Sequence, residues 1–111
     1  MRKVAIITGA SSGIGRSLAL KGAELGYNLA LFARNYEALL SLKNEISQFS
    51  DCQVLLVKGD VSIEDDCIQL VEQTFNTFHH IDILINNAGI SMRSLFKDLM
   101  LIPALLMRIS M

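Results

Sequence analysis

The sequence contains only two cysteines, Cys52 and Cys67, and their spacing matches neither a disulfide framework nor a zinc-binding motif. We therefore expect two reduced, packed thiols in a cytoplasmic protein. The adjacent His79 and His80 have no evident third ligand in the sequence, so we expect no metal site.

The chain also lacks an excess of charge and a long apolar run. Ten basic and eleven acidic side chains give a formal net charge of −1, which leaves no electrostatic footprint for nucleic acid or for an anionic membrane. No run of about eighteen apolar residues is present, so no transmembrane helix is expected. The apolar run after Met1-Arg2-Lys3 is too short for a signal peptide and predicts a first strand.

Strand-like apolar runs alternate with helical patterns along the chain. Hydrophobic residues make up 51% of the 111 residues, which is enough for one small domain with a packed core. Strands are predicted at residues 4–8, 29–33, 53–58 and 81–86. The short loops and the intervening helices predict an α/β fold, with a doubly wound parallel sheet in the strand order 3-2-1-4.

The helices are predicted from the spacing of apolar residues and from residues that favour helix ends. Gly26 suits a left-handed position after the first helix, Asn35 can cap the second, and residues 62–65 resemble a capping box for the third. The expected buried faces are Ile14, Leu18, Gly22 and Leu25 in the first helix, Leu39, Leu42, Ile46 and Phe49 in the second, and Ile68, Val71, Phe75 and Phe78 in the third.

A glycine-rich turn separates the first strand from the first helix. Its sequence is Thr8-Gly9-Ala10-Ser11-Ser12-Gly13-Ile14-Gly15. Free backbone N–H groups and the helix dipole make such a turn a phosphate site, although a glycine-rich turn alone is often only a loop. Gly9 is expected to release the strand into the turn, Gly13 to let the backbone approach a pyrophosphate, and Gly15 to let the helix pack closely. Ser11 and Ser12 add hydroxyl donors. No Lys-Ser or Lys-Thr pair follows the glycines, which excludes an NTPase P-loop.

The end of the second strand indicates which dinucleotide fits. Residues 32–35 contain no carboxylate that would accept a hydrogen bond from a ribose 2′-hydroxyl, whereas Arg34 can pair with a 2′-phosphate. Arg16 is a candidate for a second positive charge at the same group. The alternative is that both arginines are solvated surface residues. The sequence therefore favours NADP over NAD as the cofactor.

Polar residues also follow the third and fourth strands. Asp60 either accepts from an adenine amino group or serves as a turn aspartate. Asn86 and Asn87 either hold their turn through bonds to the backbone or line the ligand, and Gly89 would let the chain pass close to the cofactor. Because the carboxyl ends of parallel strands meet at one edge of the sheet, we expect these turns to lie together.

Three motifs together resemble the classical short-chain dehydrogenase/reductase family in sequence, order and separation: residues 8–15, Asp60-Val61 and Asn86-Asn87-Ala88-Gly89. The resemblance covers about residues 3–90. It implies a Rossmann fold, a nicotinamide dinucleotide cofactor, and hydride transfer between that cofactor and a small alcohol or carbonyl substrate. The cofactor-binding positions that follow from the motifs and the resemblance are Gly9, Ser11, Ser12, Gly13, Ile14, Gly15, Arg34, Asn35, Asp60, Val61, Asn86, Ala88 and Gly89.

The chain departs from this family in its catalytic residues. The family uses a serine, a Tyr-x-x-x-Lys pair and an asparagine, all after the fourth strand. This sequence has no tyrosine after Tyr36, no asparagine after Asn87, and only Lys97 among later lysines. Hydride transfer to a carbonyl leaves an oxyanion that must be protonated, and no residue of this chain is assigned that role. We therefore predict either the cofactor half of an NADP-dependent oxidoreductase or a non-catalytic NADP-binding module.

The last segment differs in composition from the rest of the chain. Residues 91–111 contain an apolar run interrupted by Pro103 and lack a clean polar helix face. We hypothesise a truncated or frameshifted member of the family, with a cofactor-binding half-domain at residues 1–90 and an atypical apolar tail at residues 91–111. An incomplete sheet would leave the fourth strand as an exposed edge, which favours self-association and poor solubility.

Overall fold

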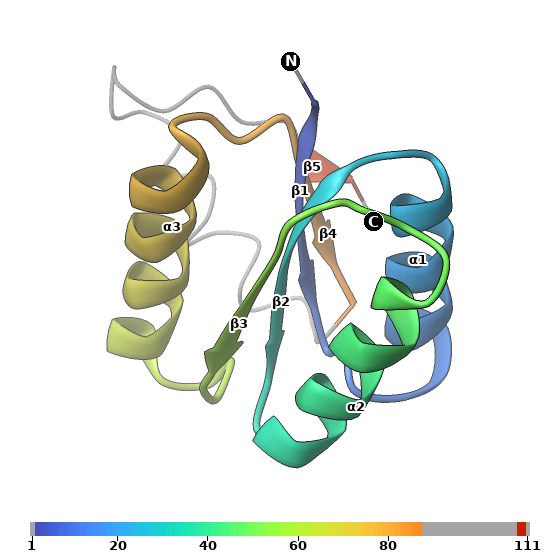
Figure 1. Ribbon diagram of the computed structural model, residues 1–111. Helices are drawn as coiled ribbons and strands as arrows, with labels where there is room; N and C mark the ends of the chain where they lie inside the picture. The colour runs from blue at the N-terminus through green and yellow to red at the C-terminus, as the bar shows by residue number, and fades with distance from the viewer. Residues whose placement is uncertain (1, 88–108, 111) are drawn as a thin grey trace.

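Apolar runs form the strands of a parallel sheet in the computed structural model, which describes residues 2–87 and 109–110. The strands are β1 (Val4–Thr8), β2 (Asn28–Ala33), β3 (Val54–Lys58), β4 (Ile83–Asn86) and a two-residue β5 (Ile109–Ser110). Neighbouring strands all run parallel, in the order β3-β2-β1-β4-β5 (Figure 1). The predicted α/β fold and the order of the first four strands are confirmed.

The prediction that the fourth strand forms an exposed edge is wrong. β4 pairs with β1 on one side and with β5 on the other, through Leu84 and Ile85. The apolar tail supplies β5, which the interrupted pattern of residues 91–111 did not indicate. The rest of that tail lies outside the described residues, so self-association, poor solubility and the division of the chain at residue 90 stay predictions.

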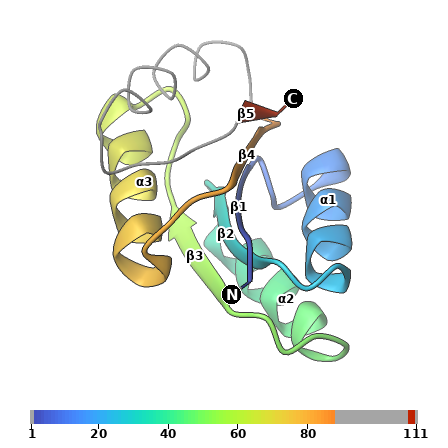
Figure 2. The same cartoon turned by 90° about the horizontal axis from the view of Figure 1, so that it is seen from above.

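Helices cover both faces of the sheet. α1 (Gly13–Glu24) and α2 (Tyr36–Ser47) lie on one face, and α3 (Glu64–Phe78) lies on the other (Figures 1 and 2). The core is accordingly divided into two clusters, in which Leu31 packs with Leu42 on the first face and Phe32 packs with Leu70 on the second. Every residue of β1 is buried, as expected for a strand covered on both sides.

The buried face of α1 differs from the prediction. The helix buries Gly15, Ala19 and Ala23, while Ile14 is 70% exposed and Leu25 is exposed at the helix end. Small side chains let the helix backbone approach the sheet, and this packing outweighs the burial of the larger Ile14 and Leu25. In α2, Leu39, Leu42 and Ile46 are buried as predicted, whereas Phe49 lies beyond the end of the helix and is 51% exposed. In α3, Val71 and Phe78 are buried together with Cys67, Leu70 and Thr74, while Ile68 and Phe75 are half-buried.

Two of the three predicted helix-end signals are confirmed. Gly26 has a φ of +87° and follows Leu25, the C-cap of α1. The Asn35 side chain accepts from the Ala38 N–H at 3.1 Å to cap α2. The predicted capping box is wrong, because α3 starts after Ile63 and no side chain caps it. The Ser62 hydroxyl instead donates to the Asp60 carboxylate at 2.8 Å.

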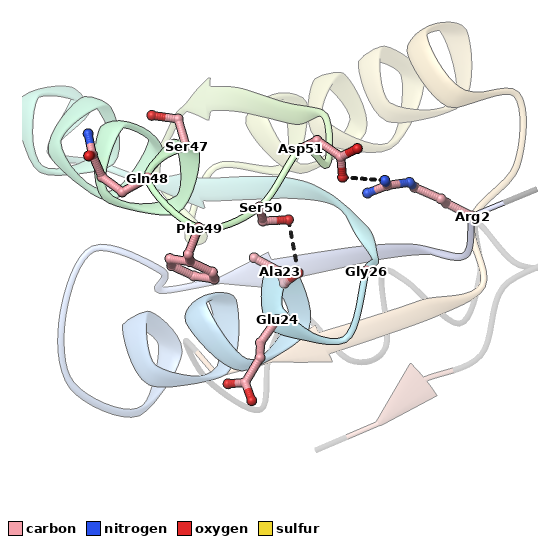
Figure 3. A pocket seen from close by; sticks show the side chains of 9 residues that line it. All are labelled: Arg2, Ala23, Glu24, Gly26, Ser47, Gln48, Phe49, Ser50 and Asp51. Carbon is pink, nitrogen blue, oxygen red and sulfur yellow. Dashed lines mark hydrogen bonds and ion pairs between the residues drawn. The ribbon is translucent and has the colours of Figure 1, made fainter.

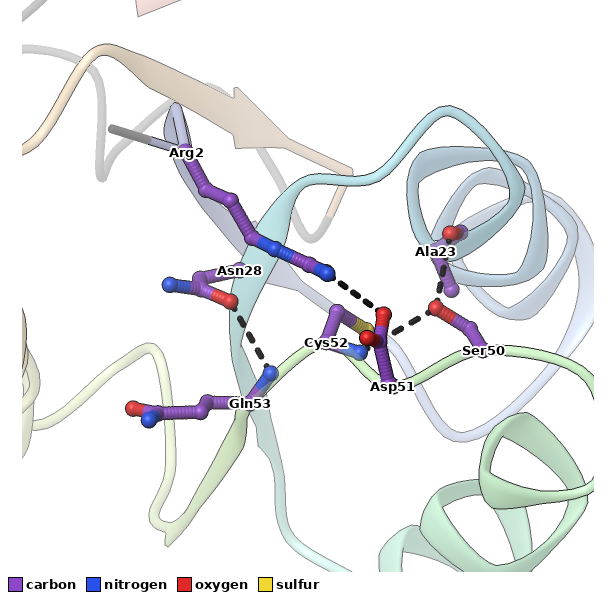
Figure 4. Close-up of polar contacts among 7 residues, drawn as sticks. All are labelled: Arg2, Ala23, Asn28, Ser50, Asp51, Cys52 and Gln53. Carbon is purple, nitrogen blue, oxygen red and sulfur yellow. Dashed lines mark hydrogen bonds and ion pairs between the residues drawn. The ribbon is translucent and has the colours of Figure 1, made fainter.

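The loop between α2 and β3 is held against the end of α1 at the amino edge of the sheet. It borders a hollow of about 570 Å³ that is lined in part by Phe49, Glu24 and Arg2 (Figure 3). The Ser50 hydroxyl donates to the Ala23 carbonyl at 3.0 Å, and Asp51 pairs with Arg2 (Figure 4). None of the predicted site residues lines this hollow.

Candidate cofactor-binding site

The strand register brings the ends of the central strands to one edge of the sheet. Thr8 at the end of β1 pairs with Phe32 of β2 and with Asn86 of β4, and Ala33 pairs with Lys58 of β3. The turns that follow β1, β2 and β3 line one pocket of about 540 Å³. Its lining residues are Gly9, Ser11, Ser12, Ala33, Arg34, Asn35, Gly59, Asp60, Val61 and Ser62.

The structure thus brings together seven of the predicted cofactor-binding residues, from three separate motifs: Gly9, Ser11, Ser12, Arg34, Asn35, Asp60 and Val61. Gly13, Ile14, Gly15 and Asn86 do not line this pocket. Ala88 and Gly89 lie outside the described residues. Sequence reasoning missed Ala33, Gly59 and Ser62; the last two flank Asp60-Val61 in the chain, so their position in the same turn was the available signal.

The glycine turn places the start of α1 against the end of β1. Gly13 has a φ of +57°, which favours glycine. A Cβ on Gly15 would overlap the Gly9 carbonyl oxygen and would lie 2.8 Å from the Asn87 side-chain nitrogen, so only glycine fits the close approach. The first N–H groups of α1 have no partner within the helix. Ser12 occupies the N-cap position without a side-chain cap bond, which leaves its hydroxyl at the pocket free for a ligand.

Arg34 and Arg16 have different surroundings. Arg34 is exposed, lines the pocket and forms no ion pair with another described residue. Arg16 does not line the pocket, and its guanidinium pairs with Glu45 of α2. Of the two arginines that the sequence offered for a 2′-phosphate, the geometry therefore supports Arg34 alone, and it places Arg16 in an ion pair between two helices.

Asp60 supplies a fixed negative charge in the same pocket. Its Oδ1 accepts from the Ser62 N–H at 2.9 Å and from the Ser62 hydroxyl at 2.8 Å. These hydrogen bonds hold the pKa of the Asp60 carboxyl below its ordinary value, and the positive charge of Arg34 contributes less in the same direction. The carboxylate is therefore ionised at neutral pH.

Thr8 connects the glycine turn to the end of β4. Its hydroxyl donates to Asn86 Oδ1 at 3.1 Å and accepts from the Asn87 N–H at 3.0 Å. The Asn87 side chain donates to the Gly9 carbonyl at 3.4 Å. Asn86 is buried, so of the two roles considered for this asparagine pair the geometry favours holding the turn. Thr8 was missed as a positioning residue; a polar residue at the end of a strand buried on both faces was the signal.

The pocket combines groups that bind anions with one that accepts a hydrogen bond. Arg34 and the free serine hydroxyls suit phosphate groups, and the start of α1, which follows its N-cap Ser12 at the pocket, adds backbone N–H donors beside it. Asp60 suits an amino group. These residues fit an adenine dinucleotide that carries a 2′-phosphate.

Among the described residues, no group of three or more His, Cys, Asp or Glu side chains is placed to hold a metal ion. No helix in that part of the chain has the length and apolar character needed to cross a membrane.

Comparison with known proteins places the part of the chain that contains β1 to β4 within one family. A family model described as short chain dehydrogenase matches residues 3–101. An 11-beta-hydroxysteroid dehydrogenase A from Arachis hypogaea is 44% identical over 96 residues, which cover 86% of this chain and 28% of that protein.

Solved structures agree with the sequence comparison. The L-sorbose reductase of Gluconobacter frateurii, complexed with NADPH and L-sorbose, is 37% identical with a TM-score of 0.76, covering 80% of this chain and 34% of that one. The alcohol dehydrogenase of Thermococcus sibiricus, complexed with 5-hydroxy-NADP, is 34% identical with a TM-score of 0.73. The match covers 77% of this chain and 36% of that one. The chain therefore spans about a third of the length of these proteins.

Proposed function

Because this chain belongs to the short-chain dehydrogenase family, we propose that it binds NADP(H) in the pocket at the carboxyl edge of its sheet. The cofactor half that it forms is that of an oxidoreductase which moves a hydride between NADP(H) and an alcohol or carbonyl carbon. The observation that carries the proposal is the position of Arg34, which has no ion-pair partner among the described residues and lines the same pocket as the glycine turn. The NADP-type cofactors in the two solved relatives support it.

Each side of the pocket has a proposed role. The start of α1, with Ser11 and Ser12, holds the pyrophosphate, and Arg34 pairs with the 2′-phosphate. Asp60 accepts from the adenine amino group, and Val61 contacts the adenine. The remaining cofactor-binding residues are proposed to lie along the rest of the cofactor: Gly13, Ile14, Gly15, Asn35, Asn86, Ala88 and Gly89. When bound, NADP(H) supplies or accepts the hydride.

A second candidate function is a non-catalytic NADP-binding module. The sequence favours it because no tyrosine follows Tyr36 and no Tyr-x-x-x-Lys pair is present. We propose that the 111-residue chain binds the cofactor and does not turn over substrate by itself. A cytoplasmic location is proposed as well, supported by two free cysteines, Cys52 and Cys67.

Titration of the purified 111-residue chain tests this proposal. NADPH and NADH are each titrated by calorimetry, and oxidation of NADPH is then followed with a panel of ketones and aldehydes. NADPH should bind at least about tenfold more tightly than NADH, because a hydrogen-bonded ion pair to Arg34 is worth roughly 1.5–3 kcal/mol. Absence of binding by either nucleotide would refute the proposal. Equal affinities would remove the role of Arg34, and turnover would exclude the non-catalytic module.

A further inference from the structure

The turn between β3 and α3 holds Asp60 through two separate sets of hydrogen bonds. One set fixes its backbone: the Asp60 N–H donates to Asp66 Oδ2 at 2.9 Å, and the Asp60 carbonyl accepts from the Ile63 N–H at 3.0 Å. The other set fixes its side chain, because the N–H and the hydroxyl of Ser62 both donate to Oδ1. The Ser62 hydroxyl therefore acts on the carboxylate and not on the path of the chain.

The two Ser62 donors together determine which carboxylate oxygen remains for a ligand. Both donors from Ser62 take the same oxygen, Oδ1. Among the described residues, no hydrogen bond to Asp60 Oδ2 is found, and both Asp60 and Ser62 line the pocket. One oxygen is thus occupied by the protein, and the other is left to accept from the ligand.

A competing partner for this carboxylate lies in the same pocket. Arg34 lines the pocket together with Asp60, and its charge contributes to lowering the pKa of the Asp60 carboxyl. The two side chains do not form an ion pair in the structure. Without the Ser62 hydroxyl, only the Ser62 N–H would hold Oδ1, and the attraction of the guanidinium would then turn the carboxylate more easily from the position in which Oδ2 meets an amino group.

We propose that Ser62 is a positioning residue that selects adenine: its hydroxyl adds a second hydrogen bond to Asp60 Oδ1, beside that of its N–H, and so keeps Oδ2 in place to accept from the amino group of the base. This inference rests on the proposed NADP(H) site and adds the residue that sets which base the site prefers. Ser62 does not touch the reacting atoms; it acts through Asp60.

The test compares two ligands that differ only at the base. NADPH carries the adenine amino group, and its hypoxanthine analogue carries a carbonyl oxygen at that position. Both are titrated into the wild-type chain and the variants Ser62→Ala, Ser62→Thr and Ser41→Ala. Ser41 is an exposed serine of α2 outside the pocket and serves as the matched control. Unfolding midpoints of all four proteins are measured in parallel.

Ser62→Ala should lower the preference for NADPH over the hypoxanthine analogue by about fivefold, the value of one hydrogen bond to an oriented group. Ser62→Thr keeps a hydroxyl and should restore the preference, and Ser41→Ala should leave it unchanged. An equal loss for both ligands in Ser62→Ala, or no loss, would overturn the inference while leaving NADP(H) binding intact. Failure of the wild-type chain to bind NADPH would instead refute the proposed function, and the inference with it.

Discussion

The substitution Gly15→Ala is expected to destabilise the protein although alanine favours helices more than glycine does. Gly15 lies in the first turn of α1 and is buried. Its backbone does not require glycine, because a positive φ is found only at other glycines of the described chain and at His79. Helix propensity alone would therefore predict a gain of at most about 1 kcal/mol.

Packing reverses this expectation. The new Cβ would overlap the Gly9 carbonyl oxygen and would lie 2.8 Å from both the Gly9 carbonyl carbon and the Asn87 side-chain nitrogen. Two of these atoms belong to the backbone and have no rotamer by which to move away. Overpacking of this kind costs about 1–3 kcal/mol, and the rigid neighbours place Gly15→Ala at the upper end. Subtracting the propensity gain leaves a net loss of about 2 kcal/mol.

Gly22→Ala in the same helix is the matched control. A Cβ there would meet only the end of the Leu29 side chain, at 3.1 Å. Its expected effect lies between no change and about 1 kcal/mol of stabilisation. Urea denaturation followed by circular dichroism gives the free energy of unfolding for both variants and the wild type. If Gly15→Ala proved as stable as Gly22→Ala, the close contact between α1 and the turn would not exist in solution.

Three further predictions concern the site and its support. Arg34→Ala should weaken NADPH binding by about tenfold or more and NADH binding little; equal losses in calorimetry, or a similar loss in the exposed control Lys43→Ala, would contradict the pairing with a 2′-phosphate. Thr8→Val keeps the shape but removes the buried hydroxyl between β1 and β4, and it should cost about 1–3 kcal/mol of unfolding free energy in urea; a loss within the error of the measurement would show that these hydrogen bonds contribute nothing. Hydrogen bonding and charge from Arg2 lower the pKa of the Asp51 carboxyl. The contribution of this ion pair to the stability of the folded protein is therefore present above the ordinary pKa of 3.8 and is lost as the pH falls through the lowered pKa. The wild type should be more stable than Asp51→Asn at pH 7, and the acid denaturation profiles of the two proteins should converge at low pH. A difference in stability that grows as the pH falls would contradict the expected pH dependence.

The sheet and its order could be predicted because they depend on signals that are local in the chain. Four apolar runs separated by helical patterns suffice for parallel strands with right-handed crossovers, and the order 3-2-1-4 is that of the doubly wound fold which this pattern matches. The buried face of α1 could not be read in the same way. Gly15, Ala19 and Ala23 carry little hydrophobic signal, whereas the exposed Ile14 and Leu25 carry much.

The candidate site was predictable to the extent that it lies at strand ends. Arg34 and Asp60 directly follow β2 and β3, and parallel strands bring such positions to one edge. The partner of Arg16 was not predictable, because Glu45 is twenty-nine residues away along the chain and belongs to another helix. The role of Ser62 was mistaken for a helix cap, since the same residue types serve both a capping box and a bond to a neighbouring carboxylate.

The sequence by itself determined the class of fold, the glycine-rich turn after β1 and the residue types at the strand ends, because each depends on neighbours along the chain. Only the tertiary structure decided that Arg34 and not Arg16 lines the pocket, and that Thr8 ties the turn to the end of β4. It also decided that β5 pairs with β4. Each of these depends on groups far apart in the sequence, whose distances are set by packing on the two faces of the sheet and not by any local pattern.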